Sequence, residues 1–139
     1  MVEFSAGGVV VDGAARTVVI VPTRRAADGS KVLALPKGHP DAGENPADAA
    51  ARELREEAGV EGELLERLGE VRYWYQREGR RVAKVVVFFL FRYVAGSPDD
   101  HDHEVEEACW VDLAEAASTL TYPGEREMAR RALTRTAVV

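Results

Sequence analysis

Three glutamates within one short segment have the types and spacing to do chemistry together. Glu53, Glu56 and Glu57 are spaced i, i+3 and i+4, so on a helix they share one face. Carboxylates this close repel one another, and a divalent cation removes the repulsion. Hard oxygen ligands are what Mg²⁺ or Mn²⁺ prefers, and a phosphate can complete the coordination shell. The spacing alone thus leaves two interpretations, an exposed acidic helix face or a Mg²⁺ site, with Mn²⁺ as the alternative metal, that faces a phosphorylated ligand.

The residues around the glutamates could complete such a site. Arg52 lies four residues before Glu56, so an ion pair could hold that carboxylate in position. Gly38, Gly43 and Glu44 lie in the segment before the helix. A glycine lets a backbone carbonyl turn toward a metal ion, or lets a phosphate approach closely. The segment is therefore expected to border the metal site.

The helix that must present the glutamates has clear start and stop signals. Asn45 is a favourable N-cap, Pro46 suits the first helical position, and Asp48 adds favourable charge to the first turn. Gly59 is the expected stop. A second, narrow face of the helix is apolar and can pack closely on a sheet; it consists of Ala47, Ala50, Ala51, Leu54 and Ala58.

The rest of the chain shows mainly strand patterns bounded by turn residues. Strands are expected at residues 4–11, 17–21, 31–35, 68–76, 82–94 and 109–111, and helices at 113–120 and 124–133. Residues 37–44 are expected to be irregular, and residues 95–107 to form an acidic loop. In segment 82–94 both alternating faces are apolar, which is typical of a central strand covered on both sides. This order of elements predicts an α/β fold, with a mixed sheet that carries helices on both faces.

The composition limits the class of protein. A length of 139 residues fits a single domain over residues 1–139. One cysteine, Cys109, excludes an intramolecular disulfide and favours the cytoplasm as the compartment. We expect neither a signal peptide nor a membrane span, because the required apolar runs are missing. The formal net charge of −6 argues against a nucleic-acid partner, since affinity for a phosphate backbone comes mostly from Lys and Arg.

The segment Gly38-x5-Glu44-x7-Arg52-Glu53-Leu54-x-Glu56-Glu57-x-Gly59-Val60 resembles the signature of the MutT-like Nudix hydrolases at every fixed position. The resemblance implies an α/β/α sandwich with a mixed β-sheet. It also implies hydrolysis of a nucleoside diphosphate linked to another group, with a small-molecule nucleotide as the partner. Members of this family are often dimers, so a homodimer is an open expectation.

The resemblance further implies roles for individual residues. The metal ligands would be four oxygen donors, the carbonyl of Gly38 and the carboxylates of Glu53, Glu56 and Glu57. Glu44 would support the loop, and Arg52 would orient a glutamate. Glu57 or Glu53 would take the proton from the attacking water. Glu104 is an outside candidate, as a further acidic metal ligand or as the base, and its alternative is a solvated loop residue.

Four residues outside the carboxylate cluster are expected to contact the substrate, each with a structural alternative. Lys37 could meet a phosphate or be an exposed loop lysine, and Lys84 could enter the substrate cleft or snorkel at the edge of its strand. Tyr75, with Tyr73 on the same strand face, could stack a nucleobase. Such aromatics more often pack in a core or on a sheet. Tyr122 could close a base pocket from between the last two helices.

The substrate branch rests on a smaller set of residues. The run Leu-Pro-Lys-Gly-His-Pro at residues 35–40, with the tyrosine-rich strand and Lys84, is similar to diadenosine polyphosphate hydrolases, which are the preferred branch. The alternatives are a sanitising hydrolase of oxidised or non-standard nucleoside triphosphates, and a pyrophosphatase of ADP-ribose or nucleotide sugars. A non-catalytic sensing domain is disfavoured because the signature is intact. An RNA-end processing protein is disfavoured because the net charge is acidic.

Overall fold

The structure is a computed structural model that describes residues 2–136. The strands are β1 (Val2–Val11), β2 (Arg16–Pro22), β3 (Lys37–Gly38), β4 (Val60–Arg77), β5 (Arg80–Gly96) and β6 (Val105–Asp112). The helices are α1 (Pro46–Ala58), the 3-10 turn η1 (Pro98–Asp100), α2 (Leu113–Thr119) and α3 (Pro123–Thr136). Within the described range, no helix is long and apolar enough to cross a membrane.

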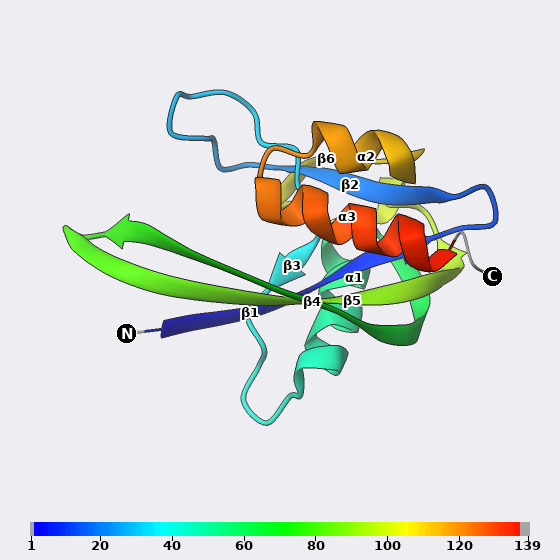
Figure 1. The fold of residues 1–139 in the computed structure, drawn as a ribbon, viewed down its shortest axis with the longest axis horizontal. Helices are drawn as coiled ribbons and strands as arrows, with labels where there is room; N and C mark the ends of the chain where they lie inside the picture. The colour runs from blue at the N-terminus through cyan, green and yellow to red at the C-terminus, as the bar shows by residue number, and fades with distance from the viewer. Residues whose placement is uncertain (1, 137–139) are drawn as a thin grey trace.

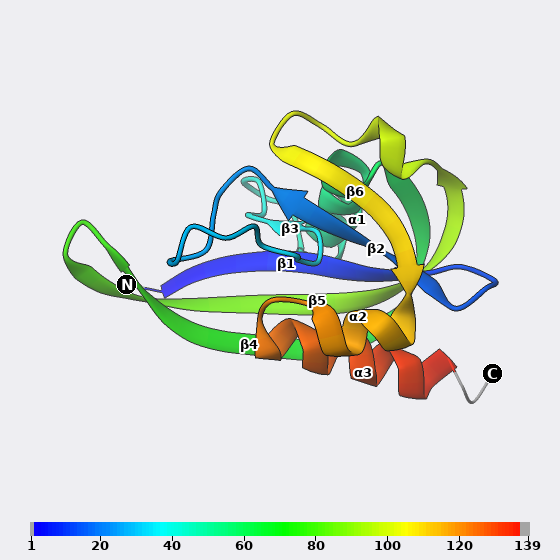
Figure 2. The same cartoon turned by 90° about the horizontal axis from the view of Figure 1, so that it is seen from above.

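A four-stranded mixed sheet lies at the centre, in the order β3-β1-β5-β4. Strand β1 runs parallel to β5, while β3 and β4 run antiparallel to their neighbours. Strands β2 and β6 pair antiparallel in a separate two-stranded sheet. Helix α1 lies on one side of the central sheet, and α2 and α3 lie on the other (Figure 1 and Figure 2). This is the α/β/α sandwich with a mixed sheet that the sequence predicts.

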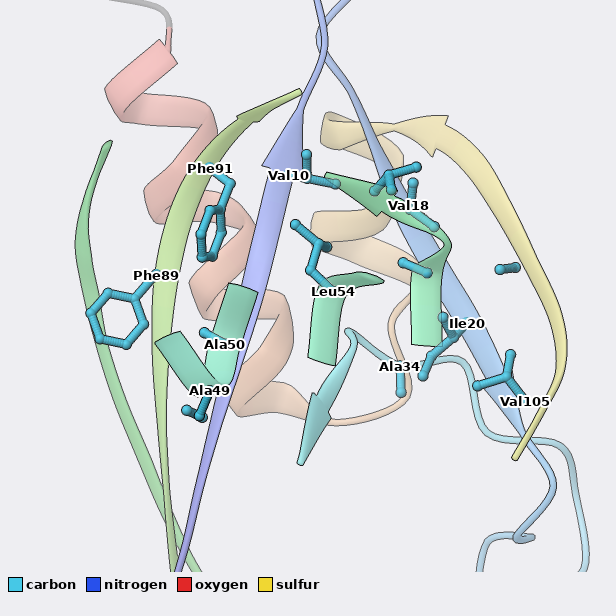
Figure 3. Close-up of a cluster of buried hydrophobic side chains, with 14 of the residues drawn as sticks. Val10, Val18, Ile20, Ala34, Ala49, Ala50, Leu54, Phe89, Phe91 and Val105 are labelled. Carbon is cyan, nitrogen blue, oxygen red and sulfur yellow. The ribbon is translucent and has the colours of Figure 1, made fainter. Parts of the chain in front are cut away.

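Strand β5 separates two hydrophobic cores. Its residues on the α1 side are Val87, Phe89 and Phe91, and those on the α3 side are Val86, Phe88 and Leu90. The first group packs in one cluster with Ala50 and Leu54 of α1 (Figure 3). The second packs with Leu113 of α2 and Met128 of α3. Each such side chain stabilises the fold by roughly 1.5–3 kcal/mol when fully buried. Because both of its faces are covered, β5 is the central strand that its pattern predicts.

Helix α1 begins and ends where the sequence places it. The Asn45 side chain accepts a hydrogen bond from the Asp48 N–H at 2.9 Å, which caps the first turn. Gly59 follows the last turn with φ of 72°, and its N–H donates to the carbonyl of Arg55. A Cβ on Gly59 would lie 2.2 Å from the carbonyl oxygen of Ser97, so only glycine fits this left-handed, closely packed position. These caps fix where α1 begins and ends.

The expected strand at residues 31–35 is wrong. The segment makes only isolated bridges, from Lys31 to Arg25 and from Ala34 to Ile20. Its other N–H groups are taken by side chains, because Leu33 donates to Thr121 Oγ1 at 2.8 Å and Leu35 donates to a carboxylate at 2.8 Å. In this segment, side-chain acceptors therefore take the place of the backbone hydrogen bonds of a regular strand. The two residues that do form a strand, β3, lie just beyond it, in the stretch expected to be irregular.

Several other boundaries also differ from the expected ones. Strand β4 begins at Val60 and not at residue 68, because three register shifts let the charged, glycine-containing stretch 60–67 stay paired with β5. Strand β5 continues to Gly96 and β6 already starts at Val105, so the acidic loop is shorter than the predicted 95–107. Helix α3 extends three residues further than expected, to Thr136.

The β4–β5 hairpin closes with a tight turn and reaches beyond the rest of the fold. Glu78 and Gly79 both have positive φ, of 51° and 76°, as a tight two-residue hairpin turn requires. Both views show the tip of this hairpin extending past the helices and past β2 and β6 (Figure 1 and Figure 2). Strand β1 runs beside its base, with Val2 opposite Ala83. One wall of the molecule is thus a long two-stranded ribbon.

Candidate active site

Arg52 is the centre of a network of acidic groups on α1 and on the loop before it. Its Nη1 donates to Glu53 at 2.9 Å and to Glu56 at 3.1 Å. Its Nε and Nη2 donate to Glu44 at 3.0 and 2.9 Å, and Nη2 also donates to the His39 carbonyl at 2.9 Å. These carboxylates raise the pKa of Arg52, with Glu44 contributing most. The predicted ion pair to Glu56 is therefore present, and the arginine holds two further carboxylates as well.

Glu44 supports the loop before α1. Its Oε1 accepts a hydrogen bond from the Asp41 N–H at 2.9 Å. The hydrogen bond from Arg52 and the Asp41 N–H hold the pKa of Glu44 below its usual range. The loop from Asp41 to Glu44 is thereby closed on itself and tied to the helix. This is the place that the sequence assigns to Glu44.

Glu53 is buried against Gly38. The glutamate is 8% exposed, and a Cβ on Gly38 would lie 2.2 Å from its carboxylate carbon. Burial raises the pKa of Glu53, while Arg52 lowers it and the charges of Glu56 and Glu104 raise it further. Because Gly38 has no side chain, the end of β3 can lie directly against the carboxylate of Glu53.

Glu57 lies on the same side of α1, half-buried. Its Oε1 accepts a hydrogen bond from the backbone N–H of Lys37 at 2.8 Å. Burial raises the pKa of Glu57 to about 7, and the charges of Glu53 and Asp102 act in the same direction. This carboxylate can therefore hold or release a proton near neutral pH.

The remaining predicted metal ligands lie at the rim of this cluster. Glu56 is exposed and bound to Arg52. Glu104 is exposed too, in the loop before β6, where its N–H bonds to Asp102 Oδ1 at 3.1 Å. That loop is fixed to α1 because the Asp102 N–H donates to the Glu56 carbonyl at 2.8 Å. Glu104 is close enough for its charge to raise the pKa of Glu53, so its loop lies beside the carboxylates of α1.

The donor set fits a hard divalent cation. Residues 2–136 contain no group of three acidic, histidine or cysteine side chains already placed to hold a metal, because Arg52 occupies oxygens of Glu53 and Glu56. Yet every metal donor in the cluster is an oxygen, and the single guanidinium of Arg52 is shared among several carboxylates. Burial raises the pKa of Glu53 and of Glu57, so added positive charge would stabilise both. Glu53, Glu56, Glu57 and the Gly38 carbonyl would hold the cation, with Glu104 beside them.

A cleft of about 810 Å³ opens beside this cluster. Glu57 and Gly38 line one end of it. Five cationic side chains line it, against the carboxylates of Glu57 and Glu125, and they are Arg24, Lys37, Arg72, Arg77 and Lys84. The chain as a whole has a net charge of −6, so positive charge is concentrated in this cleft. Such a lining suits a ligand that carries several phosphates.

Lys84 enters the cleft, as one of its two predicted positions requires. It is half-buried, and no acidic side chain in the part of the chain that the structure describes forms an ion pair with it. Burial lowers the pKa of Lys84, and the neighbouring Lys37 acts in the same direction. Lys37 also lines the cleft, but its ammonium bonds to Glu125 at 2.7 Å and its side chain is only 11% exposed. The alternative of an exposed loop lysine at residue 37 is therefore wrong.

Tyrosines form part of the cleft wall. Tyr73 and Tyr75 project from the same face of β4, with ring centroids 6.5 Å apart. Tyr73 is 39% exposed, so it is not a core residue. Tyr122 lines the cleft from between α2 and α3, where Arg24 lies over its ring and donates to its hydroxyl at 3.3 Å. The fold thus gathers the predicted tyrosines around one ligand-sized space.

Two residues of the cleft, Glu125 and Arg77, were not predicted from the sequence. For Arg24, the sequence left open a phosphate contact or a solvated surface position. Arg77 pairs with Glu3 of β1 and lies over the ring of Tyr75. All three have partners that are distant in the chain, so no local spacing could have identified them. The only available signal was a carboxylate on an otherwise apolar face of a helix, at Glu125.

The structure is an α/β/α sandwich in which the helix that bears the carboxylates lies beside a cleft lined by cations. These features define the class of the protein, a Nudix-type domain suited to phosphate ligands. The model of the NUDIX domain matches residues 2–132, and this chain belongs to the Nudix family. It is 40% identical over 131 residues to a Mycobacterium tuberculosis protein with the provisional name mutator protein MutT4, covering 91% of this chain and 53% of that one.

Two further likenesses carry a substrate in their names. A mouse bis(5'-nucleosyl)-tetraphosphatase (asymmetrical) is 38% identical over 66 residues, or 48% of this chain and 45% of that protein. The structure of a C. elegans Ap4A hydrolase shares the fold, with a TM-score of 0.70, 20% identity and coverage of 99% of both chains. The chain spans about half the length of the two curated relatives.

Proposed function

We propose that this chain is a Nudix hydrolase that cleaves a diphosphate linkage in a nucleoside polyphosphate, with Mg²⁺ or Mn²⁺ as the metal. The observation that carries the proposal is the meeting of Glu53, Glu56 and Glu57 with the end of a cleft lined by cations and tyrosines. The carboxylates suit a metal, the cations suit phosphates, and the tyrosines suit a base. Together they match one ligand, a nucleotide with several phosphates.

The residues of the site divide the work. A bound divalent cation would neutralise phosphate oxygens and acidify a water molecule. Burial raises the pKa of Glu57 to about 7, so this carboxylate accepts the proton of the attacking water near neutral pH. Glu53 is the other candidate for this role. Arg52 holds Glu53 and Glu56 in position. Lys84 binds a phosphate further along the cleft, where no ion pair within residues 2–136 occupies its ammonium.

Diadenosine polyphosphates are the preferred substrates. Tyrosines occur on opposite elements, Tyr73 and Tyr75 on β4 and Tyr122 before α3, so the cleft offers more than one place for a base to stack. The likeness to a bis(5'-nucleosyl)-tetraphosphatase supports the same branch. The second candidate is hydrolysis of oxidised nucleoside triphosphates, and the longer match to a relative with a mutator name favours it.

A substrate panel tests the proposal. The chain is incubated with Mg²⁺ and, separately, with diadenosine tetraphosphate, 8-oxo-dGTP, dGTP or ADP-ribose, and the products are resolved by anion-exchange chromatography. We expect the highest kcat/KM for diadenosine tetraphosphate, with Glu57→Gln slower by a factor on the order of 10² or more, as expected for a general base. Turnover of none of these compounds would contradict the enzymatic function. A preference for 8-oxo-dGTP would select the second candidate.

A pair of lysine variants tests the cleft itself. Lys84→Met removes the unpaired cation and should raise KM by roughly 10-fold or more, because a charge-assisted hydrogen bond to phosphate is worth about 1.5–3 kcal/mol. Lys31→Met is the matched control, since Lys31 is exposed, pairs with Glu106 and does not line the cleft. Equal KM values for the two variants would place the substrate outside this cleft.

A further inference from the structure

We propose that Glu125 is a positioning residue for the metal-binding carboxylates, acting from the opposite layer of the sandwich through residues 35–38. The inference rests on the proposed function, because it assigns Glu125 a role in arranging that site. Glu125 lies in the first turn of α3, on the face of the sheet away from α1. Its effect on Glu53 and Glu57 must therefore pass through the chain between them.

Glu125 holds both ends of a tripeptide. The residue is 4% exposed. One carboxylate oxygen accepts the N–H of Leu35 at 2.8 Å, and the other accepts the ammonium of Lys37 at 2.7 Å. A buried carboxylate with two such donors is a fixed anchor, because each donor would otherwise lose its partner in a place that water barely reaches.

The same tripeptide contacts the metal cluster on its other side. The N–H of Lys37 donates to Glu57 Oε1 at 2.8 Å. The next residue, Gly38, lies against the carboxylate of Glu53 with no room for a Cβ. The backbone of residues 37 and 38 therefore sets where both carboxylates lie, and Glu125 sets where that backbone lies.

Strand β1 leaves this backbone little freedom to adjust. The Gly8 N–H donates to the Pro36 carbonyl at 3.2 Å. A Cβ on Gly7 would lie 2.6 Å from the same carbonyl oxygen and 2.8 Å from the Lys37 Cβ. The segment is thus fitted between β1, α1 and α3, so a change in its anchor on α3 is passed on to α1.

A purely structural role for Glu125 can be separated from this one. Helix α3 is already packed through Met128, Ala129 and Ala132, which are fully buried in the core. The docking of α3 does not therefore depend on the charge of Glu125. Loss of that charge should disturb the metal cluster more than it disturbs the helix.

The test compares Glu125→Gln with the parent and with Glu127→Gln. Glu127 is a matched control on α3 whose side chain is 46% exposed and whose ion pairs within residues 2–136 are with Arg130 and Arg131. The glutamine has one acceptor oxygen for two donors, and its own N–H₂ group faces a donor. We expect the Kd for Mn²⁺, measured calorimetrically without substrate, to rise on the order of 10-fold, with kcat falling more than KM rises. Exchange of the Lys37 amide hydrogen should quicken, while that of Gly59 should not.

Two results would overturn the inference. One is a Glu125→Gln variant with parental Kd for Mn²⁺, parental kcat and parental Lys37 exchange. The other comes from the double variant Lys37→Met/Glu125→Gln, which buries no unpaired charge and so should fold even if the single variant does not. Parental Mn²⁺ binding by that double variant would also contradict it. A parent that binds Mn²⁺ but hydrolyses nothing would instead refute the proposed function alone, since metal binding and amide exchange need no substrate.

Discussion

Arg52 shows how much of the candidate site depends on one side chain. Its guanidinium donates to Glu44, Glu53, Glu56 and the carbonyl of His39. The five donors of a guanidinium lie in a fixed planar fork, whereas a lysine offers a compact point charge. The loop and the helix are therefore held at one angle by geometry as much as by charge.

Replacing this fork while keeping its charge tests that view. Arg52→Lys should lower kcat/KM by roughly 10–100-fold, because the carboxylates lose the group that orients them. Steady-state kinetics with the best substrate measures the effect. Arg55→Lys, one turn along the same helix, has only a 3.5 Å contact with the Ala51 carbonyl to lose and should be unchanged. Equal kcat/KM for the two variants would contradict the role of the fork.

Glu57 gives the metal-free protein a specific dependence on pH. Burial raises its pKa to about 7, against about 4.3 for an unfolded glutamate. Protonated Glu57 therefore contributes stability in full below about pH 4.3, and that stability is lost as pH rises through about 7. In EDTA, the melting temperature of the parent relative to Glu57→Gln should fall between roughly pH 4.5 and 8.

Melting curves of both proteins across this range measure the difference. Glu61→Gln, on the exposed start of β4, is the control and should follow the parent at every pH. A constant offset between parent and Glu57→Gln across the range would refute the linkage.

Residues of the site differ in how far the sequence predicts them. The carboxylates of α1 and Arg52 are local, so helical periodicity was enough to place them on one face. Glu125, Arg24 and Arg77 act through partners far along the chain, such as Leu35, Tyr122 and Glu3. Their function depends on how the layers meet, and no spacing within one element encodes that.

At the scale of elements, predictability depended on where each backbone finds its hydrogen bonds. Helix α1 satisfies its own backbone and carries its own caps, so its bounds were predicted correctly. Residues 31–35 have strand-like residue types, but Thr121 and Glu125 take their N–H groups. The first third of β4 has few strand-forming residues, yet it is paired through register shifts that only its partner strand can impose.

The junction between α1 and β4 allows a test at this scale. Gly59→Ala would place a Cβ 2.2 Å from the Ser97 carbonyl oxygen at a φ of 72°, so we expect a loss of about 1–3 kcal/mol in the free energy of unfolding. Urea unfolding measures it. Gly13→Ala is the control, because a Cβ there meets nothing within 4 Å. A Gly59→Ala variant within about 0.5 kcal/mol of the parent would show that the junction can relax.

At the scale of the whole molecule, the sandwich gathers negative charge on α1 and positive charge along the cleft. Neither concentration is visible in the net charge of −6. The fold class itself was predictable, because the order of elements and the doubly apolar strand β5 left few arrangements. The cleft was not, since its walls come from β1, β4, β5 and the start of α3.

Metal binding should be visible as stability of the whole fold. At a Mn²⁺ concentration 100 times its Kd, the folded state gains about 2.7 kcal/mol, so the melting temperature should rise by several degrees. Thermal unfolding with Mn²⁺, and with NaCl at equal ionic strength, measures the gain. The double variant Glu53→Gln/Glu57→Gln should show no rise with Mn²⁺ beyond that with NaCl. A parent that responds equally to both salts would exclude a specific metal site.

The projecting β4–β5 hairpin carries side chains of the cleft on a different segment of the chain from the one that bears the glutamates. The proposed metal ligands on and before α1 lie within residues 38–60, whereas Tyr73, Tyr75, Arg77 and Lys84 are all carried by the ribbon. Its turn at Glu78 and Gly79 extends past the other elements (Figure 2). Substitutions of these ribbon side chains would therefore change the lining of the cleft without altering the segment that bears the carboxylates.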